Sequence, residues 1–170
     1  MSQLTEPLPA VDLSRHAAAR YEGRAHTPAR VAVVAARFND GVVDRLVDGA
    51  LETLARAGVV EQDLMLVRVP GAWELPIVAQ RLADEGAVDA IVALGCVIRG
   101  DTSHYDVIVN ESARGLMDVS RATGVPIANG VLTCETADQA LARAGGAHGN
   151  KGAHAASAAL EMADLLRRLP

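Results

Sequence analysis

Short aliphatic runs alternate four times with longer segments of helical periodicity, and this alternation constrains the fold more than any other feature of the chain. The first run, residues 31–35, is continuous and rich in valine, as expected for a strand that is buried on both faces. In residues 43–54 the apolar side chains recur three or four positions apart and stop before Gly58, which predicts an amphipathic helix. Repeated strand–helix units are joined by right-handed crossovers, so the pattern predicts a parallel sheet covered by helices on both sides.

The remaining elements follow from the same two periodicities. Further strands are expected at about residues 63–69, 90–94 and 125–132. Further helices are expected from the end of the proline-bracketed segment 70–76 to Gly86, at about 105–123, at about 137–144, and after a glycine-rich break at 145–150. Gly95 is expected to end the third strand and to open a loop that runs to His104.

The first 29 residues differ from the rest of the chain. They contain three prolines, scattered charges and no sustained period, which predicts an arm without a core of its own. Residues 30–170 are then a single domain. The edges of a four-stranded sheet need covering, and the arm can extend the sheet of its own chain or that of a neighbouring copy.

Composition excludes several classes of protein. The 16 Lys and Arg residues stand against 21 Asp and Glu residues, and a net charge of −5 disfavours nucleic acid as the main partner. No apolar run reaches the ~18 residues needed to span a membrane. Two cysteines suit a reducing compartment, and no secretory leader follows Met1. Arginines in the first segment leave a mitochondrial presequence open, although acidic residues there argue against it, and we expect a cytoplasmic protein.

Candidate ligand-binding loops follow the strands, because open parallel sheets bind ligands beyond the carboxyl ends of their strands. Three of the four aromatic residues, Phe38, Trp73 and Tyr105, lie in or beside these loops. In a chain so poor in aromatic residues, their clustering favours a flat ligand. The alternative is that they pack the loops against the sheet. For Trp73 and Tyr105, packing against the sheet and contact with a ligand are equally open. For Phe38, which immediately follows a strand, packing against the sheet is the weaker alternative.

A second candidate feature is the segment 100–103, which precedes the third predicted helix. Thr102 or Ser103 can cap that helix, and the free backbone N–H groups there can bind an anion; a capped helix without a ligand explains the same residues. Asp101 has to point outward if an anion binds. His104 lies at the same edge and can transfer protons near neutral pH, although a lone histidine at a helix start is more often structural.

Neither a metal nor a nucleotide cofactor is expected. The other four histidines lack the spacing of metal ligands, and the chain has neither a G-x-G-x-x-G nor a P-loop pattern. Cys134 is expected to be a small buried residue. Cys96 is expected either to line the wall of a pocket or to be a small buried residue as well. Asn129 lies within a predicted strand and Arg143 near the far end of a helix, so a neighbouring subunit has to supply them if they contact the ligand.

Five motifs, in order and at matching spacing over about residues 30–168, resemble the 6,7-dimethyl-8-ribityllumazine synthase family of riboflavin biosynthesis. They are Arg37-Phe38-Asn39, Pro70-Gly71-Ala72-Trp73-Glu74-Leu75-Pro76, Val97-Ile98-Arg99-Gly100-Asp101-Thr102-Ser103-His104, Gly130-Val131-Leu132-Thr133 and Asn150-Lys151-Gly152. We therefore expect a three-layer α/β/α sandwich with a four-stranded parallel, flavodoxin-like sheet. The resemblance implies a transferase that condenses 5-amino-6-(D-ribitylamino)uracil with 3,4-dihydroxy-2-butanone 4-phosphate and releases phosphate and water, without cofactor or metal.

The resemblance also implies roles for residues on the uracil side of the site. Phe38 would stack on the uracil ring, and Glu74 would accept hydrogen bonds from the hydroxyl groups of the ribityl chain. The ring and ribityl pocket would be completed by Ala72 and Trp73, and the edge of the heterocycle by the backbone of Cys96, Val97 and Ile98. Many relatives have phenylalanine where this chain has Asn129, so an amide replaces an aromatic neighbour of the uracil and can still hydrogen-bond its edge.

On the phosphate side, the resemblance implies that Asp101 and Thr102 cradle the phosphate and that Arg143 of the adjacent subunit pairs with it. His104 would be the general acid and base for imine formation and phosphate loss. Lys151, the only lysine of the chain, stands where the family also has one near the site.

The family assembles as rings of five in which the N-terminal arm adds a strand to the neighbouring sheet. Some members pack twelve rings into an icosahedral shell, which can hold riboflavin synthase as cargo. The short break at 145–150 resembles the shell-forming members, so we expect a shell; a flexible helix connection in a free pentamer is the alternative. Two other functions remain open, an archaeal-type riboflavin synthase and a shell or flavin-binding paralogue without turnover.

Overall fold

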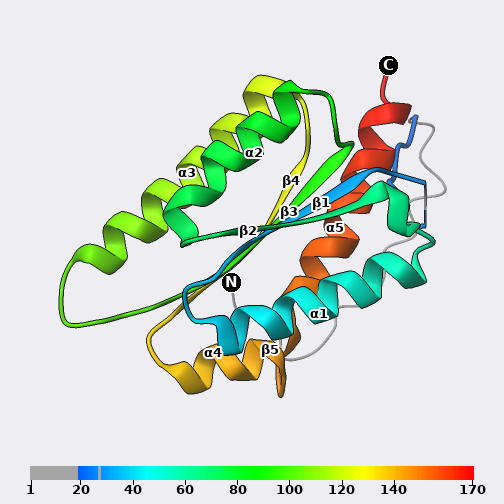
Figure 1. The fold of residues 1–170 in the computed structure, drawn as a ribbon. Helices are drawn as coiled ribbons and strands as arrows, with labels where there is room; N and C mark the ends of the chain where they lie inside the picture. Colours follow the sequence, from blue (N-terminus) through cyan, green and yellow to red (C-terminus); the bar gives the residue numbers. More distant parts are fainter. Residues whose placement is uncertain (1–18, 27) are drawn as a thin grey trace.

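A four-stranded parallel sheet organises the chain. The computed structural model describes residues 19–26 and 28–170. Its strands β1 (Val31–Ala36), β2 (Leu64–Val69), β3 (Ala90–Ile98) and β4 (Ile127–Cys134) lie in the order β2–β1–β3–β4 (Figure 1). The winding reverses between β1 and β3, because β2 lies on one side of β1 and the later strands on the other. The predicted α/β class and flavodoxin-like sheet are confirmed.

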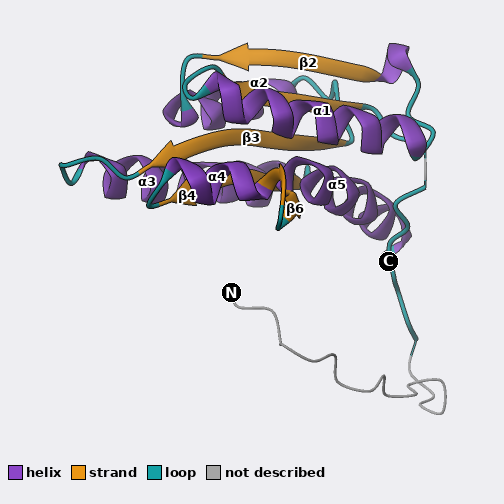
Figure 2. Ribbon diagram, turned by 90° about the horizontal axis from the view of Figure 1, so that it is seen from below, coloured by secondary structure: helices purple, strands orange, loops and turns teal. Residues whose placement is uncertain are grey.

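Helices cover both faces of the sheet, as predicted. On one face lie α1 (Asp40–Arg56), α5 (Lys151–Arg168) and the short α4 (Ala137–Arg143), which Figure 2 shows on the same side. On the other face lie α2 (Leu75–Asp84) and α3 (His104–Thr123). Two short 3₁₀ turns, η1 (Glu61–Asp63) and η2 (Ala72–Glu74), flank β2. None of the helices in the described ranges has the combination of length and hydrophobicity that a membrane-spanning helix needs.

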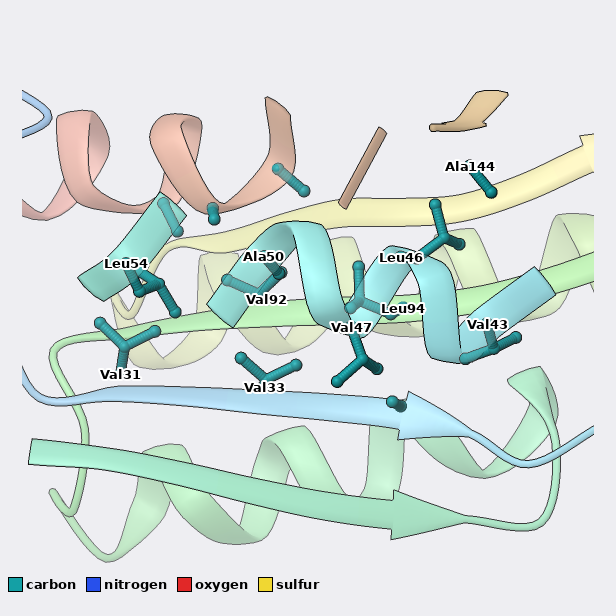
Figure 3. Packing of buried hydrophobic residues seen from close by; sticks show 14 of the residues in the cluster. Val31, Val33, Val43, Leu46, Val47, Ala50, Leu54, Val92, Leu94 and Ala144 are labelled. Carbon is teal, nitrogen blue, oxygen red and sulfur yellow. The ribbon is translucent and has the colours of Figure 1, made fainter. Parts of the chain in front are cut away.

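β1 is the centre of two apolar cores, one on each face of the sheet. All six of its residues are at most 1 % exposed, and alternate side chains enter opposite cores. Val31 and Val33 pack with Leu46, Ala50 and Leu54 of α1, as Figure 3 shows. The even-numbered residues of β1 pack beneath α2 and α3. The valine-rich run is therefore buried on both faces, as its composition predicted.

Two strand boundaries differ from the prediction. β3 does not end at Gly95 but continues to Ile98, and β4 runs to Cys134, two residues beyond its predicted end. The two strands pair in register from Ile91 with Ile127 to Ile98 with Cys134. The hydrogen bonds of this ladder outweigh the low strand propensity of glycine, so the expected loop after Gly95 is the end of a strand.

The glycine-rich break contains secondary structure that the sequence did not predict. It forms a small antiparallel hairpin of β5 (Ala144–Gly146) and β6 (Gly149–Asn150). Gly145 and Gly149 have φ of 103° and 71°, a region that L side chains rarely adopt. The hairpin leads directly into α5, whose first N–H groups are capped by the side chain of Asn150.

The described end of the N-terminal arm packs on α5 of its own chain. The backbone N–H of Arg24 donates to Asp164 at 2.9 Å, and Arg167 donates to the carbonyl of Pro28 at 3.0 Å. The arm that was predicted to add a strand to a sheet spans residues 1–29; residues 1–18 and 27 lie outside the described residues, and its described residues form no strand. β2 forms one edge of the sheet and exposes Met65 and Leu66 by 42 % and 46 %.

We predict that Gly152→Ala destabilises the protein whereas Gly41→Ala does not. Each glycine is the second residue of its helix, but a Cβ at Gly152 would lie 2.0 Å from the carbonyl oxygen of Leu46 in α1, while a Cβ at Gly41 meets nothing within 4 Å. Overpacking of this kind costs about 2 kcal/mol, or roughly 5 °C in the thermal unfolding midpoint. Equal midpoints for the two variants would show that α1 and α5 do not approach as closely as described.

Candidate functional site

The main cavity lies at the carboxyl ends of β1, β2 and β3, beside the point where the winding reverses. Its volume is about 710 Å³, and its walls come from three regions that are distant in sequence. The first region contributes Ala36 at the end of β1 and Phe38 after it, and the second contributes residues 70–74 after β2. The third contributes Cys96, Val97 and Ile98 of β3, followed by Gly100, Thr102, His104, Tyr105, Val107 and Ile108 around the start of α3. This is the location predicted for a ligand site in such a sheet.

Backbone hydrogen bonds fix the loop that carries Phe38. The N–H of Phe38 donates to the carbonyl of Pro70 at 3.0 Å, and the side chain of Asn39, whose φ is 60°, donates to the carbonyl of Cys96 at 2.9 Å. The loop is thus tied to the ends of both neighbouring strands. The ring of Phe38 remains 72 % exposed, so it does not pack the loop against the sheet.

Trp73 and Glu74 belong to the turn η2 that follows β2. One carboxylate oxygen of Glu74 accepts the backbone N–H of Gly71 at 2.8 Å and so holds the turn closed. Trp73 is 53 % exposed at the cavity wall. Phe38 and Trp73 therefore present ring surface to the cavity, as a flat ligand requires.

Tyr105 has a different environment from the other two aromatic residues. The guanidinium of Arg99 lies 4.0 Å from the centre of its ring. A cation over the ring occupies one of its faces. Tyr105 also lines the main cavity, so packing within the protein and contact with a flat ligand both stay predictions for this residue.

Arg99 joins three segments of the site, and sequence reasoning assigned it no role. Its two terminal nitrogens contact the two carboxylate oxygens of Asp106 at 3.1 and 3.3 Å, and its Nε lies 2.9 Å from Glu135. The hydrogen bonds from Arg99 to its two carboxylate partners raise the pKa of the guanidinium, and the bond to Asp106 contributes more than the bond to Glu135. Its partners lie seven and 36 positions away, so no local pattern identifies them.

The start of α3 carries the predicted acid–base residue and part of the predicted anion site. His104 is exposed and lines the cavity together with Thr102. The Thr102 hydroxyl accepts the backbone N–H of His104 at 3.4 Å, whereas Ser103 makes no side-chain cap. Asp101 is exposed and is not among the residues that line the cavity, so its predicted role toward the phosphate stays a prediction.

The two cysteines are buried, as predicted, and differ in their surroundings. Cys96 forms part of the wall of the main cavity, and its burial raises the pKa of its thiol to about 11. Burial also raises the pKa of Cys134. Both thiols are therefore protonated at neutral pH and are poor nucleophiles.

A second cavity of about 430 Å³ lies along β4 and contains the two residues that the sequence placed away from the first site. Asn129 and Arg143 line it together with Lys151 and His154. The Asn129 side-chain oxygen accepts the N–H of Val131 at 2.9 Å, and Arg143 donates to the carbonyl of Gln139 at 3.0 Å. One chain thus keeps Asn129 and Arg143 apart from Phe38 and His104.

Across residues 19–26 and 28–170, no group of three or more His, Cys, Asp or Glu side chains could hold a metal ion.

This arrangement defines a small-molecule-binding α/β protein, with its ligand cavity at the winding reversal of a flavodoxin-like sheet. Comparison with known proteins identifies the family within this class. The 6,7-dimethyl-8-ribityllumazine synthase family profile matches residues 28–167, and the chain belongs to this family of transferases.

Three relatives illustrate the similarity; each is a 6,7-dimethyl-8-ribityllumazine synthase. The protein of Halorhodospira halophila is 56% identical over 141 residues, which are 83% of this chain and 90% of the relative. That of Stenotrophomonas maltophilia is 54% identical over 152 residues, 88% of this chain and 98% of the relative. That of Xanthomonas oryzae pv. oryzae is 52% identical over 151 residues, with the same coverage. The resemblance found in the sequence motifs is confirmed.

Proposed function

We propose that the main cavity is the place where this enzyme condenses 5-amino-6-(D-ribitylamino)uracil with 3,4-dihydroxy-2-butanone 4-phosphate, giving 6,7-dimethyl-8-ribityllumazine, phosphate and water in the penultimate step of riboflavin biosynthesis. One observation carries the proposal: a single cavity gathers Phe38, Trp73, Glu74 and His104 from three separate loops of a chain that belongs to the lumazine synthase family. Residues 30–170 are the catalytic domain, and residues 1–29 are an arm.

The uracil binds at the Phe38 side of the cavity. The exposed ring of Phe38 stacks on the heterocycle, and Ala72 and Trp73 complete the wall. Glu74 holds the turn through one carboxylate oxygen and accepts hydrogen bonds from the ribityl hydroxyl groups. The edge of the ring meets the backbone of Cys96, Val97 and Ile98, where β3 extends further than its sequence pattern indicates.

The phosphorylated partner binds at the opposite side, against the start of α3. Backbone N–H groups at Asp101 and Thr102 receive the phosphate, with the Asp101 carboxylate turned outward. His104 then lies beside the carbon atoms of the second substrate. It transfers protons during imine formation and phosphate loss, which an imidazole can do near neutral pH.

The second cavity completes the site of a neighbouring copy. Arg143 supplies a planar cation for the phosphate. Because the oxygen of Asn129 is engaged by Val131, its amide N–H groups are the ones that meet the edge of the uracil. A site built in this way requires a homo-oligomer, because one chain holds its two halves apart.

The oligomer is a ring of five, and twelve rings form a closed icosahedral shell in the cytoplasm, with riboflavin synthase as an optional cargo. The half-exposed apolar edge of β2 supports the addition of a strand from a neighbouring arm. The compact hairpin at 144–150 supports the shell, since it leads into α5 without an insertion.

Mixing the two substrates tests the reaction, and His104→Ala tests the acid–base role. We expect lumazine absorbance and phosphate to appear together, and the variant to turn over roughly 100-fold more slowly without losing all activity, since positioning supplies much of the acceleration. An unchanged rate in the variant would remove His104 from the mechanism. Turnover of the lumazine product alone would instead indicate a riboflavin synthase, and no turnover a binding paralogue.

Arg143→Ala should raise the apparent KM for the phosphorylated substrate by about tenfold or more, because it leaves a phosphate dianion without its charged partner. The KM for the uracil should stay within about twofold. Steady-state kinetics with each substrate varied in turn gives both values. A change confined to the uracil KM would contradict the assignment.

Light scattering tests the assembly. With a chain of 17.7 kDa, a shell of twelve rings should give a particle of about 1 MDa. A particle of about 90 kDa would reject the shell and leave a single ring of five.

A further inference from the structure

The loop of residues 100–103 contributes Gly100 and Thr102 to the lining of the main cavity and has little support of its own. All four residues are exposed. Just before the loop, the backbone N–H of Arg99 donates to the carbonyl of Cys134, in β4, at 2.9 Å. At the end of the loop, the backbone N–H of Asp106 donates to the carbonyl of Ser103 at 3.0 Å. Something else has to fix the distance between the two ends.

The side chain of Arg99 spans those two ends. It projects from the residue before the loop and contacts the two residues after His104. The two terminal nitrogens of its guanidinium, which act as a fork, bind the carboxylate of Asp106, and the guanidinium lies over the ring of Tyr105. Nε of the same guanidinium binds Glu135, at the end of β4. The planar group is therefore held from three directions, and rotation about any one contact breaks another.

We propose that Arg99 is a positioning residue, which closes the 100–103 loop and sets the first turn of α3 so that the phosphate-binding backbone and His104 keep their mutual geometry. This proposal rests on the function proposed above. Arg99 itself lines neither cavity, so it acts through the segments it joins. An error of about 1 Å in such a loop can cost roughly 100-fold in rate, which makes its closure important.

Glu135 extends the connection toward the second cavity. Its backbone N–H donates to the side chain of Gln139 at 2.9 Å, and the carbonyl of Gln139 accepts Arg143 at 3.0 Å. The contact to Glu135 therefore orients the end of β4 and α4, whereas the contact to Asp106 closes the loop. Substituting the two acids separately distinguishes the two contributions.

Arg30 provides a matched control. It forms a similar fork on Asp89, with contacts of 2.9 and 3.4 Å, but it precedes β1, at the end of the sheet opposite to the cavity. If a bidentate arginine–carboxylate pair contributes only to overall stability, substituting Arg30 or Arg99 should have the same effects on stability and on the kinetics. Lysine keeps the charge at each position and removes the fork.

The experiment compares Arg99→Lys and Arg30→Lys with the wild-type protein. We expect Arg99→Lys to raise the KM for the phosphorylated substrate roughly tenfold and the KM for the uracil less than about twofold, and to accelerate hydrogen exchange of the amides of 100–106 about tenfold. Asp106→Asn should reproduce this pattern, and Glu135→Gln should affect exchange at 100–106 less. Arg30→Lys should change only the thermal midpoint.

The proposal is wrong if Arg99→Lys leaves both the KM values and the exchange of residues 100–106 unchanged, or if Arg30→Lys alters them equally. Should the wild-type protein fail to condense the two substrates, the function proposed above fails, and the exchange comparison still decides whether Arg99 holds the loop. Exchange that is faster throughout the chain in Arg99→Lys would show a general stability effect and also overturn the proposal.

Discussion

The burial of β1 on both faces is the constraint on which the rest of the structure depends. Six consecutive small or β-branched residues, each at most 1 % exposed, force helices onto both sides of the sheet and place β2 and β3 at the two edges of the strand. The chain has to reverse its winding beside β1. The carboxyl end of this strand thereby becomes the centre of the cavity, with Phe38 two residues beyond it.

The same packing explains why the predicted site residues line two separate cavities. The loops after β1, β2 and β3 converge at the winding reversal, whereas β4 lies beyond β3 and carries Asn129 toward the second cavity. A single sheet of this order cannot bring Asn129 to Phe38. Family membership and the chemistry of Arg143 both fit the proposal that two copies complete the site together, and on that proposal catalysis requires assembly.

The sequence predicted the layers, the order of elements and most of the cavity wall, because burial on two faces and helical periodicity are local patterns. It failed where distant contacts decide. Gly95 ended a strand in the local pattern, yet pairing with β4 continues that strand to Ile98. The contact of Arg99 with the ring of Tyr105 was not predicted, and Arg99 was missed because Glu135 lies 36 positions away.

A mixing experiment tests the divided site most directly. His104→Ala and Arg143→Ala chains, unfolded and reassembled together in equal amounts, should form mixed rings in which about a quarter of the interfaces pair an intact first cavity with an intact second one. At a low concentration of the phosphorylated substrate, the mixture should recover about a quarter of the wild-type activity. Activity no higher than the mean of the two variants would show that His104 and Arg143 serve a site within one chain, and would contradict this account.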